Sequence, residues 1–396
     1  MIEITGKYGS AIVFTENVEA TAYSQLKEIL DSETQIALGA NIRVMPDVHA
    51  GLGCVIGTTM LITDKVVPNF VGVDIGCGMK VQKLKERAED IDLAKLDNII
   101  KKRIPSGFSI RKSPHALAGE TRIEELRCKN FVNLDRAYKS IGTLGGGNHF
   151  IEINEDDEGT LYLVIHSGSR HLGTQIAGYY QEEAHLRLSA KHNQRIQFDG
   201  KVKKKDFKRA KRKQAQGRIP KNLAYCEGEL MQDYLFDMDI GQEYAFINRR
   251  AMAETIINTM GWTVLDEFQT IHNYIDTKNM ILRKGAVSAQ KDEILLIPIN
   301  MQFGSLICRG KGNQHWNYSA PHGAGRVMSR RQARQRVSLD EFRDRMQNVY
   351  TSSVSRATID EAPMVYKPAE EIMENIKDTV DVLKIIRPIY NFKAAD

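Results

Sequence analysis

Short polar stretches of the chain carry the residue types that bind metal ions. Asp74 and Cys77 lie three residues apart in GVDIGCGM, and the flanking glycines allow both side chains to turn to one side of a tight loop. An aspartate oxygen and a cysteine thiolate together suit a borderline divalent ion such as Mn, Zn or Fe. A buried cysteine in a turn would give the same pattern, so this motif predicts a metal site only together with others.

Three histidines extend this motif to a candidate ligand set. His149, His166 and His272 each stand beside glycines or at the edge of an expected strand. With Asp74 and Cys77 they give five ligands, which is more than one four-coordinate ion needs. The set could hold two ions if the thiolate bridges them, and paired metals stabilise both entering and leaving oxygens in phosphoryl transfer. A single catalytic zinc with three protein ligands is the simpler alternative.

Two further stretches indicate phosphate chemistry. The run LGGGNHF resembles a loop whose backbone N–H groups approach an anion closely. The chain has no GxxxxGK[ST] sequence, so a nucleotide must be held in some way other than a Walker-type loop. His322 stands in SAPHGAGRVMSR, and a neutral imidazole is a competent nucleophile at phosphorus. From its surroundings alone, His322 is a nucleophile, a metal ligand or a structural residue.

Arg326 and Arg330 follow His322 in the same stretch. They are four residues apart, and this spacing predicts that both lie on one face of a helix towards a common anion.

Mixed helices and strands must position these motifs. Apolar spacing predicts helices over 18–40, 85–103, 176–193, 240–260 and 369–386, and strands within 51–73, 161–166 and 294–299. These elements show no regular βαβ alternation. We therefore expect one α+β domain over residues 1–396 rather than a doubly wound sheet.

Bulk properties are those of an ordinary globular protein. The chain has 396 residues, of which 42% are hydrophobic and 27% charged. No apolar run is long enough to span a bilayer, and the N-terminus lacks the regions of a signal peptide, so we expect a cytoplasmic protein without a membrane partner. The five cysteines are scattered and odd in number, so we do not expect a disulfide framework.

Positive charge is concentrated in one segment. The net charge is +5, yet between Lys201 and Lys221 eleven Lys and Arg residues stand against one acidic residue, Asp206. This concentration predicts a phosphate-rich partner, and the near absence of aromatic residues favours contact with its backbone over base reading. We expect 195–225 to be a basic protruding segment. A solvated surface helix or loop is the alternative.

Taken in order, the polar clusters resemble those of the RtcB family of RNA-splicing ligases. The clusters are MPDVHAG (45–51), GVDIGCGM (72–79), GTLGGGNHFIE (142–152), HSGSRHLG (166–173), HNY (272–274) and SAPHGAGRVMSR (319–330). The likeness runs from about Met45 to the C-terminal RPIYNFK. It implies a single large mixed domain with its metal centre in a central cleft. It also implies a ligase that joins RNA 3′-phosphate or 2′,3′-cyclic phosphate ends to 5′-hydroxyl ends, using GTP and two Mn²⁺ ions.

The resemblance assigns roles to the metal and nucleophile candidates. Two manganese ions would be held by Asp74, Cys77, His149, His166 and His272. Cys77 would bridge them, with Asp74 and His149 on one ion and the other two histidines on the second. His322 would carry the guanylate covalently before passing it to the RNA 3′-phosphate as an RNA-pp-G end.

The same resemblance assigns residues to GTP and RNA. The GTP contacts would be Asn148, His149, Glu152, His272, Asn273, Pro298, Ile299, Asn300, Met301, Ser305, His322, Gly323, Ala324, Gly325 and Lys393. RNA or nucleotide phosphates would be bound by Arg170, Arg326 and Arg330. The guanine loop reads PINMQFGS, whereas the family usually has a sequence close to PGSMG. The chain is also short for the family, and together these departures indicate a divergent member. We expect it to act in RNA repair or tRNA splicing and to be a monomer.

Two other functions fit part of the pattern. A metal-dependent RNA-end phosphodiesterase or guanylylating enzyme would keep the five ligands without ligation. A non-catalytic RNA-binding protein is the other alternative, and only the basic segment supports it.

Overall fold

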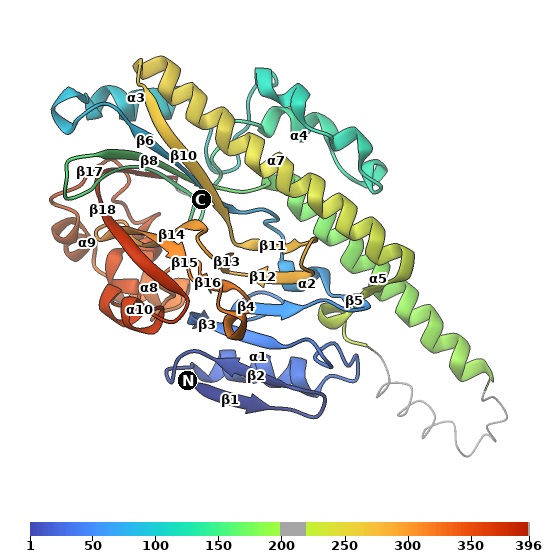
Figure 1. The fold of residues 1–396 in the computed structure, drawn as a ribbon. Coiled ribbons are helices and arrows are strands. Elements are labelled where there is room, and N and C mark those ends of the chain that lie inside the picture. The colour runs from blue at the N-terminus through green and yellow to red at the C-terminus, as the bar shows by residue number, and fades with distance from the viewer. Residues whose placement is uncertain (199–218, 395–396) are drawn as a thin grey trace.

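Two β-sheets form the centre of the chain, and helices cover their outer sides (Figure 1). We describe this arrangement from a computed structural model, which covers the backbone of residues 1–198 and 219–394. Helices and strands are interleaved along the chain without regular βαβ alternation, so the predicted α+β class is confirmed. Most of the basic segment predicted over 195–225 lies outside the described residues.

The first sheet joins the N-terminal strands to a hairpin from much later in the chain. Its order is β1 (Ile2–Thr5), β2 (Ser10–Val13), β3 (Ile42–His49), β4 (Ile56–Leu61), β12 (Ile281–Lys284) and β11 (Asn273–Asp276). Strands β2 and β3 run parallel, whereas the other neighbours are antiparallel. The pairing of β3 with β4 is irregular between Val44 and His49, and Asp47 lies in this interval. Such irregularities redirect side chains, and here one directs Asp47 towards the site described below.

The second sheet carries most of the chemistry. Its order is β10 (Val264–Ile271), β6 (Gly78–Leu84), β8 (Leu161–Ser167), β7 (Phe150–Glu155), β18 (Val380–Lys393), β15 (Gly304–Gly310) and β14 (Ile294–Asn300), with β17 (Tyr350–Thr351) beside β18. All the pairings along this order are antiparallel. Since β6 and β7 begin at the edge where β8 and β10 end, four chain segments meet at that edge.

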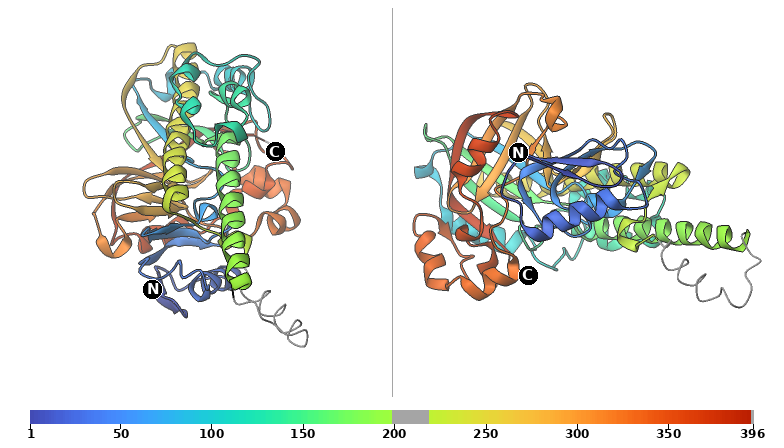
Figure 2. Two further views of the ribbon diagram at one scale, coloured as in Figure 1. Left: turned by 90° about the vertical axis from the view of Figure 1, so that its right-hand side faces the viewer. Right: turned by 90° about the horizontal axis from the view of Figure 1, so that it is seen from below.

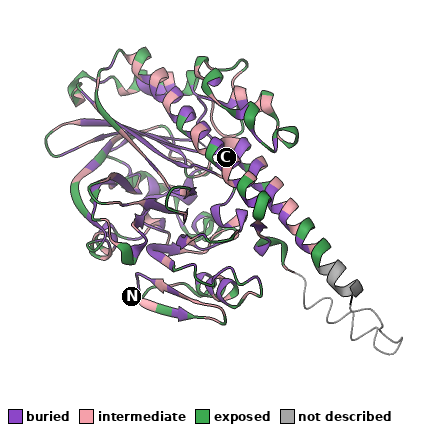
Figure 3. Ribbon diagram, turned by 45° about the vertical axis from the view of Figure 1, so that its right-hand side comes forward, coloured by how far each residue is buried: buried purple, intermediate pink, exposed green. Residues whose placement is uncertain are grey.

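Two long helices lie side by side across the back of the sheets (Figure 2). They are α5 (Arg170–Phe198) and α7 (Gly228–Met260), and both turn buried residues inwards and exposed residues outwards (Figure 3). Ile176 and Tyr180 of α5 and Tyr234 and Tyr244 of α7 belong to one apolar core, which accounts for the inward faces. No helix in the described ranges combines the length and the apolar character that crossing a bilayer requires.

Shorter elements complete the fold. The helices are α1 (Ala20–Asp31), α2 (Pro68–Val71), α3 (Leu93–Arg103), α4 (Leu134–Ser140), α8 (Arg330–Arg336), α9 (Leu339–Arg345) and α10 (Ala369–Asn375). The small sheets pair β5 (Lys65–Val66) with β9 (Cys226–Glu227), and β13 (Ala286–Ser288) with β16 (Ser319–Pro321). Because β16 ends at Pro321, it presents the next residue, His322, at its end.

Three predicted helices are too long. The helix expected over 18–40 ends at Asp31, and the helix expected over 85–103 begins only at Leu93. The helix expected over 369–386 ends at Asn375, and from Val380 the chain runs as the long strand β18. This stretch reads VDVLKIIRPIYNF, which is rich in β-branched and aromatic residues, and it pairs with β7 on one side and β15 on the other. Tertiary pairing therefore overrides the apparent helical spacing.

Candidate metal centre and nucleotide pocket

Neighbouring strands bring the predicted metal ligands to one edge of the second sheet. Cys77 precedes β6, His149 precedes β7, and His272 follows β10. The fourth, His166, lies near the end of β8 and is directly opposite Met79 of β6 and Phe150 of β7. Strand register thus places ligands from four separate motifs within reach of one another.

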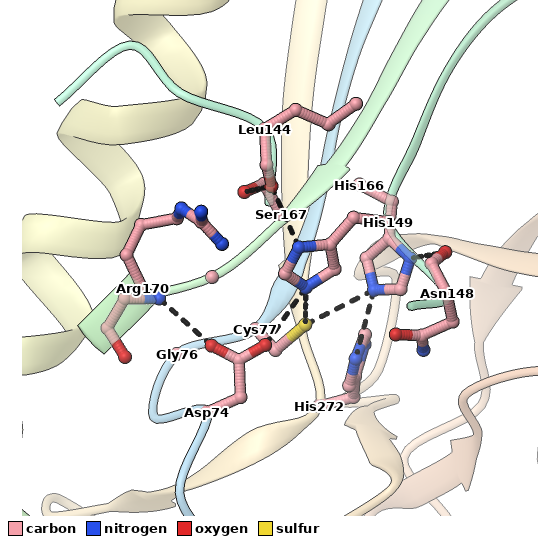
Figure 4. Close-up of polar contacts among 12 residues, drawn as sticks. Asp74, Gly76, Cys77, Leu144, Asn148, His149, His166, Ser167, Arg170 and His272 are labelled. Atoms are coloured by element: carbon pink, nitrogen blue, oxygen red, sulfur yellow. Dashed lines mark hydrogen bonds and ion pairs between the residues drawn. The ribbon is translucent and has the colours of Figure 1, made fainter. Parts of the chain in front are cut away.

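The five predicted ligands converge in the structure (Figure 4). The Cys77 Sγ lies 3.2 Å from His166 Nε2 and 3.4 Å from His149 Nε2. His149 Nε2 is also 2.9 Å from Asp74 Oδ2, and His166 Nε2 is 3.4 Å from His272 Nε2. The ligand atoms of Cys77, His149 and His166 form the tightest group, and all three residues are buried.

Backbone carbonyls determine which nitrogens of the histidines face the cluster. His149 Nδ1 lies 2.8 Å from the carbonyl oxygen of Leu144, and His166 Nδ1 lies 3.1 Å from that of Asn148. A carbonyl oxygen can only accept, so each Nδ1 carries the proton and each Nε2 turns a lone pair towards Cys77. Histidines that ligate metals have this same support from behind.

The local electrostatics also suit a cation. Burial lowers the pKa of His166 and His272 well below the usual value, so both rings are neutral at pH 7. Burial opposes ionisation of Asp74, but its contacts with His149, Cys77 and Arg170 outweigh that effect and lower its pKa to about 2. An anionic oxygen, a sulfur and several lone pairs that face one another form a donor set that fits a divalent transition metal.

His322 lies beside this cluster rather than within it. Its ring centre is 4.8 Å from that of His272, and its Nδ1 is 2.7 Å from Oδ2 of the fully buried Asp47. Since the carboxylate engages Nδ1, Nε2 is the nitrogen available for chemistry. His49, which stands in the cluster MPDVHAG and has no role assigned by the sequence, uses its own Nδ1 to contact the Asp47 backbone oxygen.

A pocket opens on the His322 side of the cluster. Of the residues predicted to contact GTP, its lining contains Asn148, Glu152, Pro298, Ile299, Asn300, Met301, Ser305, His322, Gly323, Ala324, Gly325 and Lys393. His149, His272 and Asn273 do not line it. The Asn273 side-chain oxygen instead accepts a hydrogen bond from the Gly285 backbone, where it supports the turn between β12 and β13.

The glycine-rich loop before His149 serves close packing. Gly145 has a φ of +90°, and a Cβ there would lie 1.9 Å from Arg170 Nη1 and 2.7 Å from His149 Nδ1. The predicted phosphate-binding residue Arg170 lies outside this pocket, on the Asp74 side of the metal-type cluster, where it lines a separate cleft. Its guanidinium donates to Thr143 Oγ1 and to the Gly107 carbonyl oxygen.

Arg326 and Arg330 do not share a helix face, so that prediction is wrong. The Ser329 side chain accepts a hydrogen bond from Gln332 N and caps α8, which makes Arg330 the first helical residue and leaves Arg326 outside. The two arginines nevertheless meet a common anion, the carboxylate of Glu361. Arg330 Nη1 lies 2.6 Å from Glu361 Oε1, and Arg326 Nη1 lies 3.3 Å from it.

Sequence reasoning missed Glu361 and two aromatic residues of the pocket. Lys393 Nζ lies 2.7 Å from Glu361 Oε2, which also accepts a hydrogen bond from Tyr366. Burial alone would raise the pKa of Glu361, but the charges of Lys393 and the two arginines lower it to about 2. Phe150 and Tyr366 add aromatic surface. Phe150 could have been found from its position next to His149 in NHF, whereas no motif of the sequence points to Tyr366.

Glu152 behaves differently from Glu361. It is buried, and its two oxygens accept from the side-chain amides of Asn391 and Asn154. Burial raises the pKa of Glu152 to about 7, against the effect of those hydrogen bonds. Near neutral pH this carboxyl can therefore either donate or accept a hydrogen bond in the pocket.

Comparison with known proteins agrees with these motifs. A family model described as tRNA-splicing ligase RtcB matches residues 32–130 and 115–394. The RNA-splicing ligase RtcB of Escherichia coli (strain K12) is 31% identical over 94% of this chain and 94% of its own length. The tRNA-splicing ligase RtcB of Archaeoglobus fulgidus is 27% identical over 88% of this chain and 87% of its own. With this coverage and with its buried Cys/His cluster, the chain belongs to the RtcB family of RNA-splicing ligases.

Proposed function

We propose that this protein is a GTP- and Mn²⁺-dependent ligase that joins RNA 3′-phosphate or 2′,3′-cyclic phosphate ends to 5′-hydroxyl ends. The observation that carries the proposal is the position of His322. This residue lines the pocket, contacts Asp47 through Nδ1 and lies beside the metal-type cluster. RNA ligation is supported by the family and by the names of the relatives.

In the first step, Nε2 of His322 attacks the α-phosphorus of GTP. A nitrogen–phosphorus bond forms, the bond to the pyrophosphate oxygen breaks, and pyrophosphate leaves. Asp47 accepts the hydrogen bond from Nδ1–H, so its carboxylate stabilises the positive charge that the ring acquires. The buried position of this carboxylate strengthens the effect, because no water competes for it.

The pocket holds the nucleotide during this step. Phe150 and Tyr366 offer aromatic surface to the base, and Glu152 and Lys393 offer polar contacts to its edge. Glu361 holds Lys393 and Arg330 in place, and it limits the positive charge that these two residues bring to the pocket.

The remaining steps transfer the guanylate and seal the RNA. An oxygen of the RNA 3′-phosphate attacks the phosphorus of the histidine adduct and releases His322, which gives an RNA-pp-G end. The 5′-hydroxyl then attacks the 3′-phosphorus and GMP leaves. A cyclic end must first be opened by water. Divalent ions held by the five ligands would neutralise charge that develops on the phosphate oxygens.

Labelled GTP tests the proposal directly. With α-labelled GTP and Mn²⁺, we expect an acid-labile, alkali-stable adduct on the wild-type protein and none on His322→Ala. His315→Ala is the matched control, since His315 is an exposed histidine close in sequence to His322. An adduct on His322→Ala would refute the assignment of the nucleophile.

RNA with a 3′-phosphate and a 5′-hydroxyl end distinguishes ligation from its alternatives. Sealed product is the expected outcome. An RNA-pp-G end without sealing would indicate a guanylylating enzyme, and hydrolysis of a cyclic end alone would indicate a phosphodiesterase. Binding without any reaction would indicate a non-catalytic RNA-binding protein.

A further inference from the structure

A second cleft reaches the metal-type cluster from the side opposite the nucleotide pocket. Its lining includes Asp74 and His149, together with Phe108, Arg136 and His171. The nucleotide pocket, in contrast, reaches the cluster at Asn148 and His166. Arg170 and Asn148 lie on opposite sides of the cluster in Figure 4 and mark the two approaches. The ligand cluster therefore separates two spaces.

Phe108 stands at the mouth of this second cleft with its side chain in solvent. It is 84% exposed, although the loop that carries it is held firmly. Arg170 Nη2 donates to the Gly107 carbonyl oxygen at 2.7 Å, and Arg136 Nη2 donates to the Phe108 carbonyl oxygen at 3.4 Å. The Gly107 N–H also bonds to the Gly145 carbonyl oxygen, beside the metal ligands. A single exposed aromatic residue is ordinary, but this one is fixed at the entrance to a site.

Positive charge continues outwards from Phe108. The segment 101–112, KKRIPSGFSIRK, contains five Lys and Arg residues and no acidic residue. Lys102, Arg103, Arg111 and Lys112 line an adjoining groove, and Ile110 belongs to both the groove and the cleft. An aromatic platform followed by a basic groove is the combination that binds single-stranded nucleic acid.

We propose that the second cleft receives the 5′-hydroxyl end of single-stranded RNA, with the terminal base stacked on Phe108 and the following phosphates in the basic groove. This inference rests on the proposed ligation. In-line displacement at the 3′-phosphorus requires the entering 5′-oxygen to approach from the side opposite the departing GMP. Since the nucleotide pocket holds the guanylate, the 5′-hydroxyl must enter from the other side, where Phe108 lies.

The test measures the use of the 5′-hydroxyl strand and the activation of the 3′-phosphate strand separately. In ligation between separate oligonucleotides, we expect Phe108→Ala to raise the KM for the 5′-hydroxyl strand roughly tenfold and to leave kcat nearly unchanged. Histidine guanylylation and formation of the RNA-pp-G end should match the wild type, because neither step uses the 5′-hydroxyl strand. Phe108→Trp should restore the KM. Phe246→Ala is the control, because Phe246 is an exposed aromatic residue on α7 outside both clefts.

Two other outcomes of the ligation assay overturn the inference. An unchanged KM would show that nothing stacks on Phe108, and a loss of 3′-end activation would assign the cleft to the other strand. If the wild type forms no guanylate adduct, the proposed function fails on its own. Binding of a 3′-labelled 5′-hydroxyl oligonucleotide, followed by fluorescence anisotropy, then still tests the cleft: Phe108→Ala must weaken binding roughly tenfold, or the inference is wrong.

Discussion

Asp47 determines which nitrogen of His322 is left free for the proposed reaction. Its carboxylate is fully buried and only 2.7 Å from Nδ1, so it both orients the ring and fixes its tautomer. Backbone carbonyl oxygens play the same part at His149 and His166, where each accepts a hydrogen bond from Nδ1 and so orients the ring. At the scale of single residues, chemistry thus depends on the group behind each imidazole as much as on the imidazole itself.

Replacing Asp47 by asparagine should slow the proposed guanylylation. Asn keeps the shape of the side chain but removes the negative charge, and its amide can favour the wrong tautomer of His322. We expect the rate at saturating GTP to fall by roughly 100-fold or more, with little change in KM. Single-turnover adduct formation measures this rate. Asp157→Asn, at an exposed acidic residue, should react like the wild type, and an equal rate for Asp47→Asn would contradict the role of Asp47.

Glu152 should make stability fall as the pH rises towards neutrality. Burial raises its pKa from 4.5 to about 7, so between these values the folded state holds a proton that the unfolded state has released. The stabilisation is present in full below about pH 4.5, is lost as the pH rises to about 7, and amounts to about 3 kcal/mol. Urea unfolding of the metal-free protein at several pH values measures it. In Glu152→Gln this part of the pH dependence should vanish, and an unchanged slope would exclude Glu152 as its source.

At the scale of elements, helix α7 supports the strand ends that carry the ligands. Arg249 of α7 is fully buried, and its Nη1 donates to the carbonyl oxygens of Gly76 and Ser167, each at 2.8 Å. These two residues flank Cys77 and His166. Burial lowers the pKa of Arg249 to about 10, so the guanidinium stays charged at pH 7. The helix therefore fixes the spacing between two ligands without contributing one.

Arg249→Met should loosen this edge of the sheet. The substitution leaves two buried carbonyl oxygens without their donor, and we expect a loss of roughly 2–4 kcal/mol in the free energy of unfolding together with weaker Mn²⁺ binding. Denaturant unfolding and calorimetric titration measure the two effects. The neighbouring Arg250 forms partly exposed ion pairs with Glu120 and Glu254, so Arg250→Met should cost less than about 1 kcal/mol. Equal effects of the two substitutions would refute the supporting role.

Site residues could be predicted from the sequence where a short motif alone brings them together. Asp74 and Cys77 share one short loop, and His149 stands beside glycines, so these ligands were readable from sequence. Asp47 stands in the polar cluster MPDVHAG, but the sequence assigns it no role, because that role depends on the irregular pairing of β3 with β4 and on β16, which lies far along the chain. Phe108 had no signal at all, since its importance comes from arginines on two other elements.

Element boundaries show the same limit. The strands at 161–166 and 294–299 were predicted closely, because their apolar runs are buried. Helix α7 begins at Gly228, well before the predicted 240, and β18 replaces the second half of a predicted helix. Both errors arise where long-range packing, rather than local spacing, decides the structure.

At the scale of the whole molecule, the metal-type cluster joins parts of the chain that are distant in sequence. Its residues come from the ends of β6, β7, β8 and β10, so an ion bound there would link strands from both halves of the chain. A ligand that binds only the folded state stabilises it by mass action.

Mn²⁺ should accordingly raise the melting temperature. At about 100 times the dissociation constant we expect roughly 3 kcal/mol of stabilisation, and a chelator should reverse it. Thermal unfolding with and without Mn²⁺ measures the shift. His166→Ala, which removes a ligand from the tightest group, should lose it, whereas His315→Ala should keep it. A shift that persists in His166→Ala would place the ion elsewhere.

Strand β18 also has a consequence for how the protein is made. It is the last strand of the second sheet to leave the ribosome, yet it lies inside that sheet, between β7 and β15. Its end supplies Lys393 to the lining of the pocket beside His322 and Asn391 to the hydrogen bond with Glu152. During translation, β6, β7 and β8 can pair early, but β14 and β15 must wait for β18 before they join them. A nascent chain that has not yet reached residue 393 therefore contains all five predicted metal ligands but has an incomplete pocket beside His322, and it cannot begin the proposed chemistry until β18 has been made.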